Sequence, residues 1–140
     1  MVRTMDEVLD RMRAIEAELP RRDGVAVFNR VYLEVTELIR HRLHDGFFRD
    51  PRFMEQFDVV FAGLYFESVD AAMAGAEVPR PWAPLVEARR RRKVAPAQYA
   101  LAGMNAHINH DLALAVVIAC GRARRGRSCN ALSGRTCAGR

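Results

Sequence analysis

Residues 96–120 read PAQYALAGMNAHINHDLALAVVIAC, and this stretch decides the fold class. It opens with Pro96, a residue well tolerated in the first turn of a helix, and contains no second proline. Its apolar residues follow helical spacing and do not alternate with polar ones as in a half-buried strand. The stretch therefore predicts one long helix from Pro96 to about Cys120.

The same spacing, read outward from this stretch, predicts helices in the rest of the chain. Pro20, Pro51 and a proline cluster at residues 79–84 mark the boundaries between them. The expected helices cover Met5–Leu19, Val25–Asp45, Pro51–Ala76 and a short Trp82–Arg91. We find no convincing strand and no internal repeat, so the predicted fold is all-α, an irregular bundle of about five helices, two or three of them long.

Each expected helix carries an apolar stripe that should face the core. In the second helix the inward residues are expected to be Phe28, Val31, Tyr32, Val35, Leu38 and Ile39. In the third helix they are expected to be Phe53, Phe57, Val60, Phe61, Leu64 and Met73. Capping residues support two helix starts, namely Thr4 with Glu7 before the first and Asp50 before the third.

Charge divides the 140-residue chain into two parts. Residues 1–120 contain 16 basic and 17 acidic residues, whereas residues 121–140 contain six arginines and no acidic residue. We expect one helical domain over 1–120 and a basic tail over 121–140 that is disordered or not native to the protein. A basic arm that touches nucleic acid is the less favoured reading of the tail.

Composition excludes several classes of protein. The longest apolar runs have eight and nine residues, against the ~20 that a membrane-spanning helix needs. The N-terminal residues include Asp6 and Glu7 and lack the apolar stretch of a signal peptide, so a cytoplasmic location is expected. No glycine-rich phosphate loop and no Gly-x-Ser-x-Gly motif occurs, and the cysteines form no C-x-x-C pair.

The histidines form the most specific pattern in the sequence. His41 and His44 make one H-x-x-H pair, and His107 and His110 make a second on another expected helix. Residues three apart lie on the same side of a helix, so each pair can direct two imidazoles to one point. Imidazole is a good ligand for zinc and iron, and the pattern suggests a site for such a divalent transition metal.

Carboxylates accompany both histidine pairs. Glu37 shares a helix sector with His41 and His44, and Asp111 shares one with His107 and His110. They could bind the metal or orient an imidazole through its other nitrogen. The candidate metal residues are therefore His41, His44, His107, His110, Asp111 and Glu37, which requires the second and fifth helices to be neighbours.

A second interpretation of the same residues remains open. The histidine, asparagine and aspartate side chains can form a buried polar network that fixes helix register, which would make the chain a non-catalytic interaction module. The pattern matches no established metalloenzyme motif such as H-E-x-x-H, and whether the chain is an enzyme stays open. Apolar residues surround the long helix after Asp111, so self-association through an exposed helix face is a further expectation.

The run of basic residues 89–93 also has two readings. It lies where the short fourth helix should end, where cations complement the helix dipole. A solvated helix end is the favoured reading, and an anion-binding patch is the alternative.

Three segments carry a resemblance to a known family. These are FNRVYLEVT at 28–36, VFAGLY at 60–65 and, most specifically, NAHINHDL at 105–112. Over roughly residues 20–120 the chain resembles an uncharacterised, mainly actinobacterial family, domain of unknown function 5995. The resemblance implies an all-α fold and no established activity. Family members look longer than this chain, which implies truncation or a frameshift where the basic tail begins.

Overall fold

The structure is a computed structural model that describes the backbone of residues 2–133 and, in the last helix, the side chains up to residue 125. Its helices are α1 (Met5–Glu18), α2 (Gly24–Arg42), α3 (Pro51–Met73), α4 (Ala83–Ala88), α5 (Pro96–Ala106) and α6 (Leu112–Ser133). A 3-10 turn, η1 (Arg80–Trp82), precedes α4, and a π-helical turn, η2 (His107–Asp111), joins α5 to α6. Residues 2–133 contain no strand, so the predicted all-α fold is confirmed.

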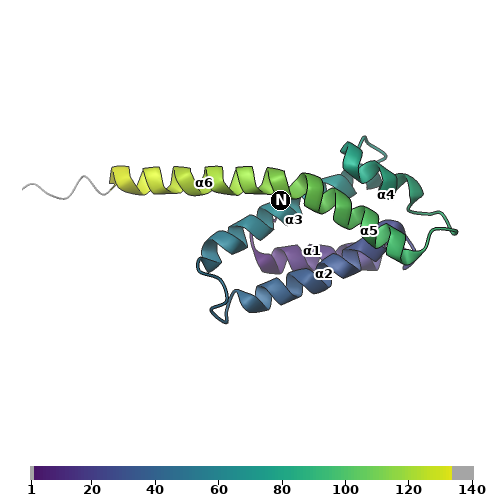
Figure 1. The fold of residues 1–140 in the computed structure, drawn as a ribbon, viewed down its shortest axis with the longest axis horizontal. Helices are drawn as coiled ribbons and strands as arrows, with labels where there is room; N and C mark the ends of the chain where they lie inside the picture. The colour runs from purple at the N-terminus through teal and green to yellow at the C-terminus, as the bar shows by residue number, and fades with distance from the viewer. Residues whose placement is uncertain (1, 134–140) are drawn as a thin grey trace, which may run out of the picture.

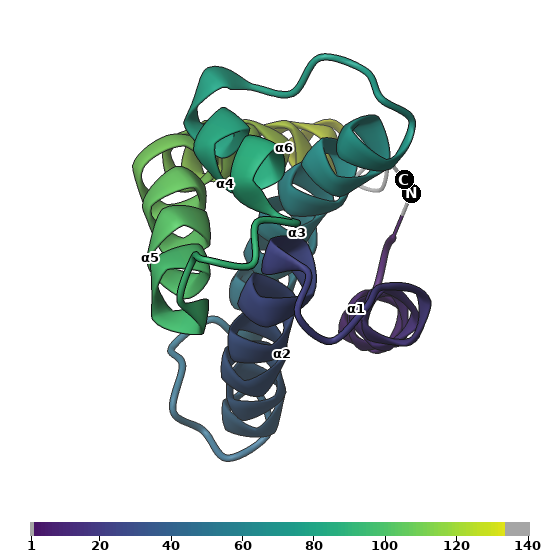
Figure 2. The same ribbon diagram turned by 90° about the vertical axis from the view of Figure 1, so that its right-hand side faces the viewer.

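Helix α2 lies at the centre of the bundle. Helices α1 and α5 pack on opposite sides of it, as Figure 2 shows, and α3 packs against α1 and α6. The expectation that the second and fifth helices are neighbours is therefore confirmed.

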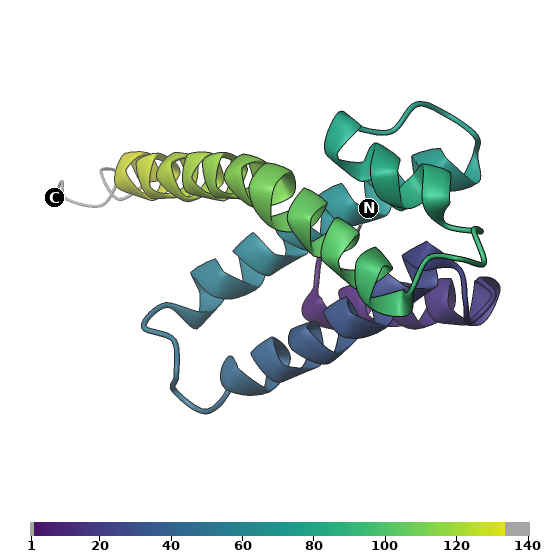
Figure 3. The same cartoon turned by 45° about the vertical axis from the view of Figure 1, so that its right-hand side comes forward.

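Helices α5 and α6 form one continuous rod through η2 (Figure 1). The rod passes the expected end at Cys120 and continues to Ser133, and α6 extends beyond the rest of the bundle (Figures 1 and 3). The proposed boundary at residue 120 remains a prediction, because the helix crosses it and residues 134–140 lie outside the described part. The side chains of Cys129 and Cys137 also lie outside it.

Local side-chain chemistry explains where the helices begin. The Thr4 side chain accepts a hydrogen bond from the Glu7 backbone N–H at 3.2 Å, as the capping pattern predicted. Asp50 caps α3 in the same way, and Pro51 occupies the first turn. The Asp23 carboxylate caps α2 by accepting from the Val25 N–H at 2.9 Å.

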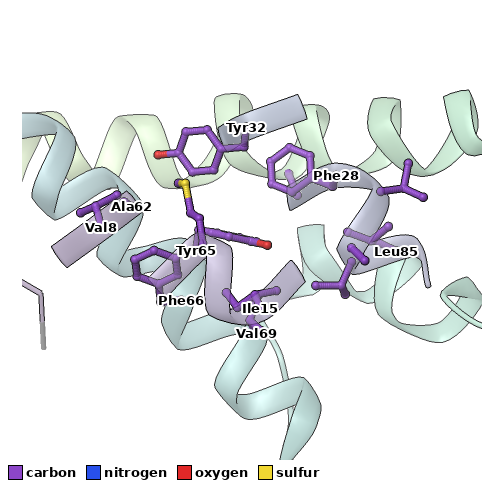
Figure 4. Packing of buried hydrophobic residues seen from close by; sticks show 14 of the residues in the cluster. Val8, Ile15, Phe28, Tyr32, Ala62, Tyr65, Phe66, Val69 and Leu85 are labelled. Carbon is purple, nitrogen blue, oxygen red and sulfur yellow. The ribbon is translucent and has the colours of Figure 1, made fainter. Parts of the chain in front are cut away.

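The core forms where α1, α2 and α3 meet and where η1 and α4 cover one end. Phe28 and Tyr32 of α2 face Tyr65 of α3 in this core (Figure 4). Asn29 is fully buried among them and is paired at both ends of its amide. Its Nδ2 donates to the Met12 carbonyl at 2.9 Å, and its Oδ1 accepts from the Tyr65 hydroxyl at 3.1 Å.

Part of the predicted core is exposed instead. On α2, Phe28 and Tyr32 are buried, but the residues we call the α2 stripe, Val31, Val35 and Leu38, are 36%, 47% and 56% exposed. Met73 at the end of α3 is also exposed. The α2 stripe lacks a cover because α5 follows α2 only as far as His107, after which the rod packs along α3.

No helix in the described part of the chain is both long enough and apolar enough to cross a membrane.

Candidate functional site

The carboxylate of Asp111 is the centre of a buried polar network. Its Oδ2 lies 2.9 Å from Nδ1 of His107, and its Oδ1 lies 2.8 Å from Nδ1 of His110. The indole N–H of Trp82 donates to both oxygens, at 3.1 and 3.3 Å. Asp111 is only 1% exposed, so three donors compensate a carboxylate that has lost its water.

The π-helical turn places these groups. A π turn contains one more residue per hydrogen-bonded ring than an α turn, and it recurs at sites where side-chain direction matters. Here it spans His107 to Asp111, and the Leu112 N–H donates to the His107 carbonyl. The predicted convergence of His107 and His110 is therefore real, but the point of convergence is the Asp111 carboxylate.

Burial sets the protonation state of His107. Its pKa is lowered from the ordinary value by burial, an effect partly opposed by the hydrogen bond with Asp111. The imidazole is therefore neutral at neutral pH, and its Nδ1 carries the hydrogen that Asp111 accepts. Its Nε2 then holds a free lone pair, and this atom is buried without a hydrogen-bond partner.

Aromatic rings enclose the His107 imidazole. Phe61 of α3 stacks on it with ring centroids 3.7 Å apart and an interplanar angle of 6°. Tyr32 approaches at 4.5 Å, and the rings of Phe28 and Trp82 lie at 6.0 Å. A neutral imidazole with a free nitrogen can accept a proton or bind a metal. Here, however, the aromatic rings occupy the space around the imidazole.

A second carboxylate lies close to the same aromatic group. Asp58 of α3 is 6% exposed, and its Oδ2 has no hydrogen-bond partner. Burial raises the pKa of Asp58 to about 7. The pKa of Tyr32 is raised by burial and, to a smaller extent, by the charges of Asp58, Tyr65 and Asp111.

The other histidine pair lies at the C-terminal end of α2, with His41 in its last turn and His44 just beyond it. His41 and His44 are exposed near the end of the helix, where His41 is nine residues beyond Tyr32 and thus ~13 Å further along the axis. Glu37 forms an ion pair with Arg13, with 3.0 Å between Oε1 and Nη2. Among the side chains that the structure describes, residues 2–125, no three histidine, cysteine, aspartate or glutamate groups are placed to hold one metal ion.

Three members of the site were not predicted from the sequence. Trp82 is 29 positions before Asp111, and no periodic signal links the two. Phe61 reads as an ordinary core residue. Asp58 did leave a signal, because it precedes Ala62 and Tyr65 by one and two helical turns and so breaks an otherwise buried stripe with a carboxylate.

The amides beside the site also differ from expectation. The second interpretation of this segment places its asparagines, Asn105 and Asn109, in a buried polar network. Instead, the Asn109 amide donates to Oδ1 of Asn105 at 2.6 Å, one turn back on the same exposed face.

The NAHINHDL segment at 105–112 that carries this network is also the most specific part of the sequence resemblance. A family model described as a family of unknown function, DUF5995, matches residues 5–135. The chain belongs to this family. The match extends past the expected domain boundary at residue 120 and includes all of α6. No curated protein and no solved structure matches the chain.

Proposed function

We propose that the protein is a helical interaction module that self-associates through α6, and that the Asp111 network directs this helix out of the bundle. The observation that carries the proposal is the exposure of Val117, which is 70% accessible in the apolar first part of α6, Leu112–Cys120. Leu114 and Val116 beside it are 42% and 45% exposed. We call these three residues the α6 face.

The covered side of α6 is narrow. Ala115 and Ala119 are buried, and α3 is the helix on which α6 packs. A helix with apolar residues on most sides is stabilised when several of them are covered, and contiguous exposed apolar patches mark interaction sites. The α6 face therefore suits a partner helix.

A second copy of the chain offers a complementary surface. The α2 stripe has the spacing of one helical face and is left uncovered by the bundle. Glu34, an exposed carboxylate without an ion pair in the described part, flanks it. The α6 face continues into exposed Arg124 and Arg125, so apolar contact and opposite charge favour docking of α6 of one copy on α2 of another.

The test measures mass by light scattering over a range of concentrations. We expect the wild-type mass to rise towards two chains, and Val117→Glu and Val35→Glu each to remain at one chain. Leu101→Glu, at a 61% exposed position on α5 outside both surfaces, is the matched control and should behave as wild type.

A mixture of the two variants separates this pairing from its alternatives. One Val117→Glu chain retains an intact α2 stripe, and one Val35→Glu chain retains an intact α6 face. Mixing them should restore part of the association. If Val35→Glu alone still associates, α6 pairs with some other surface and the proposed pairing is wrong.

Metal binding is a second candidate function, favoured by the unpartnered Nε2 of His107. The module proposal expects no stoichiometric zinc or iron in protein expressed with both metals. Metal that copurifies and is lost in His107→Ala would favour a metal site. If the metal is lost in His44→Ala as well, the result would favour the four-histidine site with Glu37 and Asp111.

A further inference from the structure

A cleft of about 490 Å³ lies where the turn before α2 meets the connection from α4 to α5. Seven cationic residues line it, namely Arg21, Arg22, Arg30 and the run 90–93. No carboxylate is among its lining residues. We call this the basic cleft. It is separate from the Asp111 network and from the two apolar surfaces.

The two basic segments are held together by a buried ion pair. Nε of Arg89 lies 2.8 Å from Oδ2 of Asp23, and the two side chains are 8% and 1% exposed. The Gly24 N–H donates to the Arg89 carbonyl at 2.8 Å. The Tyr99 hydroxyl lies 2.8 Å from the Ala88 carbonyl and 2.7 Å from that of Arg91. The fold thus fixes residues 90–93 against residues 21–22.

The cleft cations form no ion pair within the described part of the chain, although Arg30 donates a hydrogen bond to the Arg21 carbonyl at 2.9 Å. Arg11, Arg13, Arg40, Arg42 and Arg89 all form ion pairs in the described part of the chain, whereas none of the seven cleft cations does. Like charges gathered within a Debye length, about 8 Å at physiological ionic strength, repel one another unless an anion lies between them. A solvated helix end explains residues 90–93 but not the three arginines that meet them from α2 and its preceding turn.

The surrounding charge favours a compact anion over an extended one. Within residues 1–120, the seven cleft cations leave nine basic residues against 17 acidic ones. A long nucleic acid that passed beyond the cleft would meet this negative surface. A small molecule that remains inside the cleft would not.

We propose that the basic cleft binds a small organic molecule carrying two or three phosphate groups. Arginine guanidinium groups bind phosphate oxygens through paired, charge-assisted hydrogen bonds. Val27, Val94 and Pro96 line the remainder of the cleft and can contact the organic part. The volume lies within the ~300–1,000 Å³ range of small-molecule sites.

Calorimetric titration of the full chain with inorganic tripolyphosphate tests the proposal. We expect saturable binding of one equivalent, weakened on the order of tenfold or more in Arg91→Gln/Arg92→Gln, since each bond to a charged group is strong. Arg49→Gln/Arg52→Gln removes the same charge from exposed positions outside the cleft and should leave binding unchanged. Melting curves of both variants check that they are folded.

Three results would overturn the proposal. The first is the absence of saturable binding by the wild-type chain. The second is an equal loss of affinity in the control variant, which would reveal only a general charge effect. The third is tighter binding of a single-stranded oligonucleotide that increases with its length, which would identify a nucleic-acid surface instead.

Discussion

Gly103 shows how one missing side chain sets the approach of two helices. A Cβ atom added there would lie 2.3 Å from Cγ and Cδ2 of Phe28, far inside contact distance. Gly103→Ala should therefore push α5 away from α2 and destabilise the fold by about 1–3 kcal/mol. Urea unfolding measures the change.

The matched control is Gly63, which lies inside α3 and has no atom within 4 Å of an added Cβ. Gly63→Ala should stabilise the protein by about 0.5–1 kcal/mol, because alanine has the higher helix propensity. Equal effects of the two substitutions would show that space at Gly103 does not limit the packing of α5.

Asp58 should make stability depend on pH. Its pKa is about 7 in the folded chain because it is buried, against ~3.9 for an unperturbed aspartate. Between these values the folded state keeps a proton that the unfolded state has released. Stability therefore falls as pH rises through this window, by at most ~1.4 kcal/mol per pH unit.

The measurement compares the wild type with Asp58→Asn at pH 5 and pH 7.5. We expect the variant to be relatively more stable at the higher pH. His107 has a lowered pKa and acts in the opposite sense, with stability lost on acidification, but it is present in both proteins and cancels in the difference. A difference that does not change with pH would contradict the burial of an uncompensated Asp58.

At the scale of the element, the two histidines of η2 should contribute unequally to the stability of the fold. His107 is 3% exposed and stacked on Phe61, whereas the His110 side chain is 33% exposed. His107→Ala should cost about 3 kcal/mol or more, as truncation of a buried ring does. His110→Ala should cost under about 1 kcal/mol, since water can replace its hydrogen bond to Asp111.

Thermal melting of the two single variants measures this asymmetry. Comparable losses would mean that the H-x-x-H pair acts as a unit, as the metal hypothesis requires. A large loss at His107 alone fits a structural network.

The helices themselves were largely predictable, because local rules determine them. Prolines, caps and helical spacing placed the starts of α1, α2 and α3 within a residue of those observed. Which side of each helix is buried was less predictable, and the α2 stripe is the clearest case. A stripe indicates which side chains gain from burial, but whether a partner covers them depends on the path of α5 and α6, which is a tertiary property.

The site was predictable only where its members share a helix. Spacing placed Asp111 on the same side as His107 and His110, and the structure joins all three. Spacing could not predict the π turn or the Trp82 contact. It also could not place His41 and His44 relative to the second pair, since that distance depends on how far α2 extends beyond Tyr32.

At the scale of the whole molecule, the bundle around α2 and α3 should be more stable against local opening than the projecting end of α6. The rod is held by Asp111 of η2 and by Ala115 and Ala119 of α6, all buried, and α6 then extends past the bundle (Figure 3). Backbone hydrogen bonds with little tertiary cover open easily. In dilute solution we therefore expect rapid amide exchange from about residue 120 to Ser133, and slow exchange in α2 and α3 near Asn29.

Raising the protein concentration should change the amide-exchange pattern mainly in α6 and α2. If α6 docks on the α2 stripe of a second copy, exchange after residue 120 should slow at high concentration, and the melting temperature should rise by mass action. Val117→Glu should exchange rapidly at both concentrations, whereas Leu101→Glu should follow the wild type. The mass could instead double while amide exchange in α6 stays rapid. That result would place the contact on another surface, because docking on the α6 face should protect the amides of this helix.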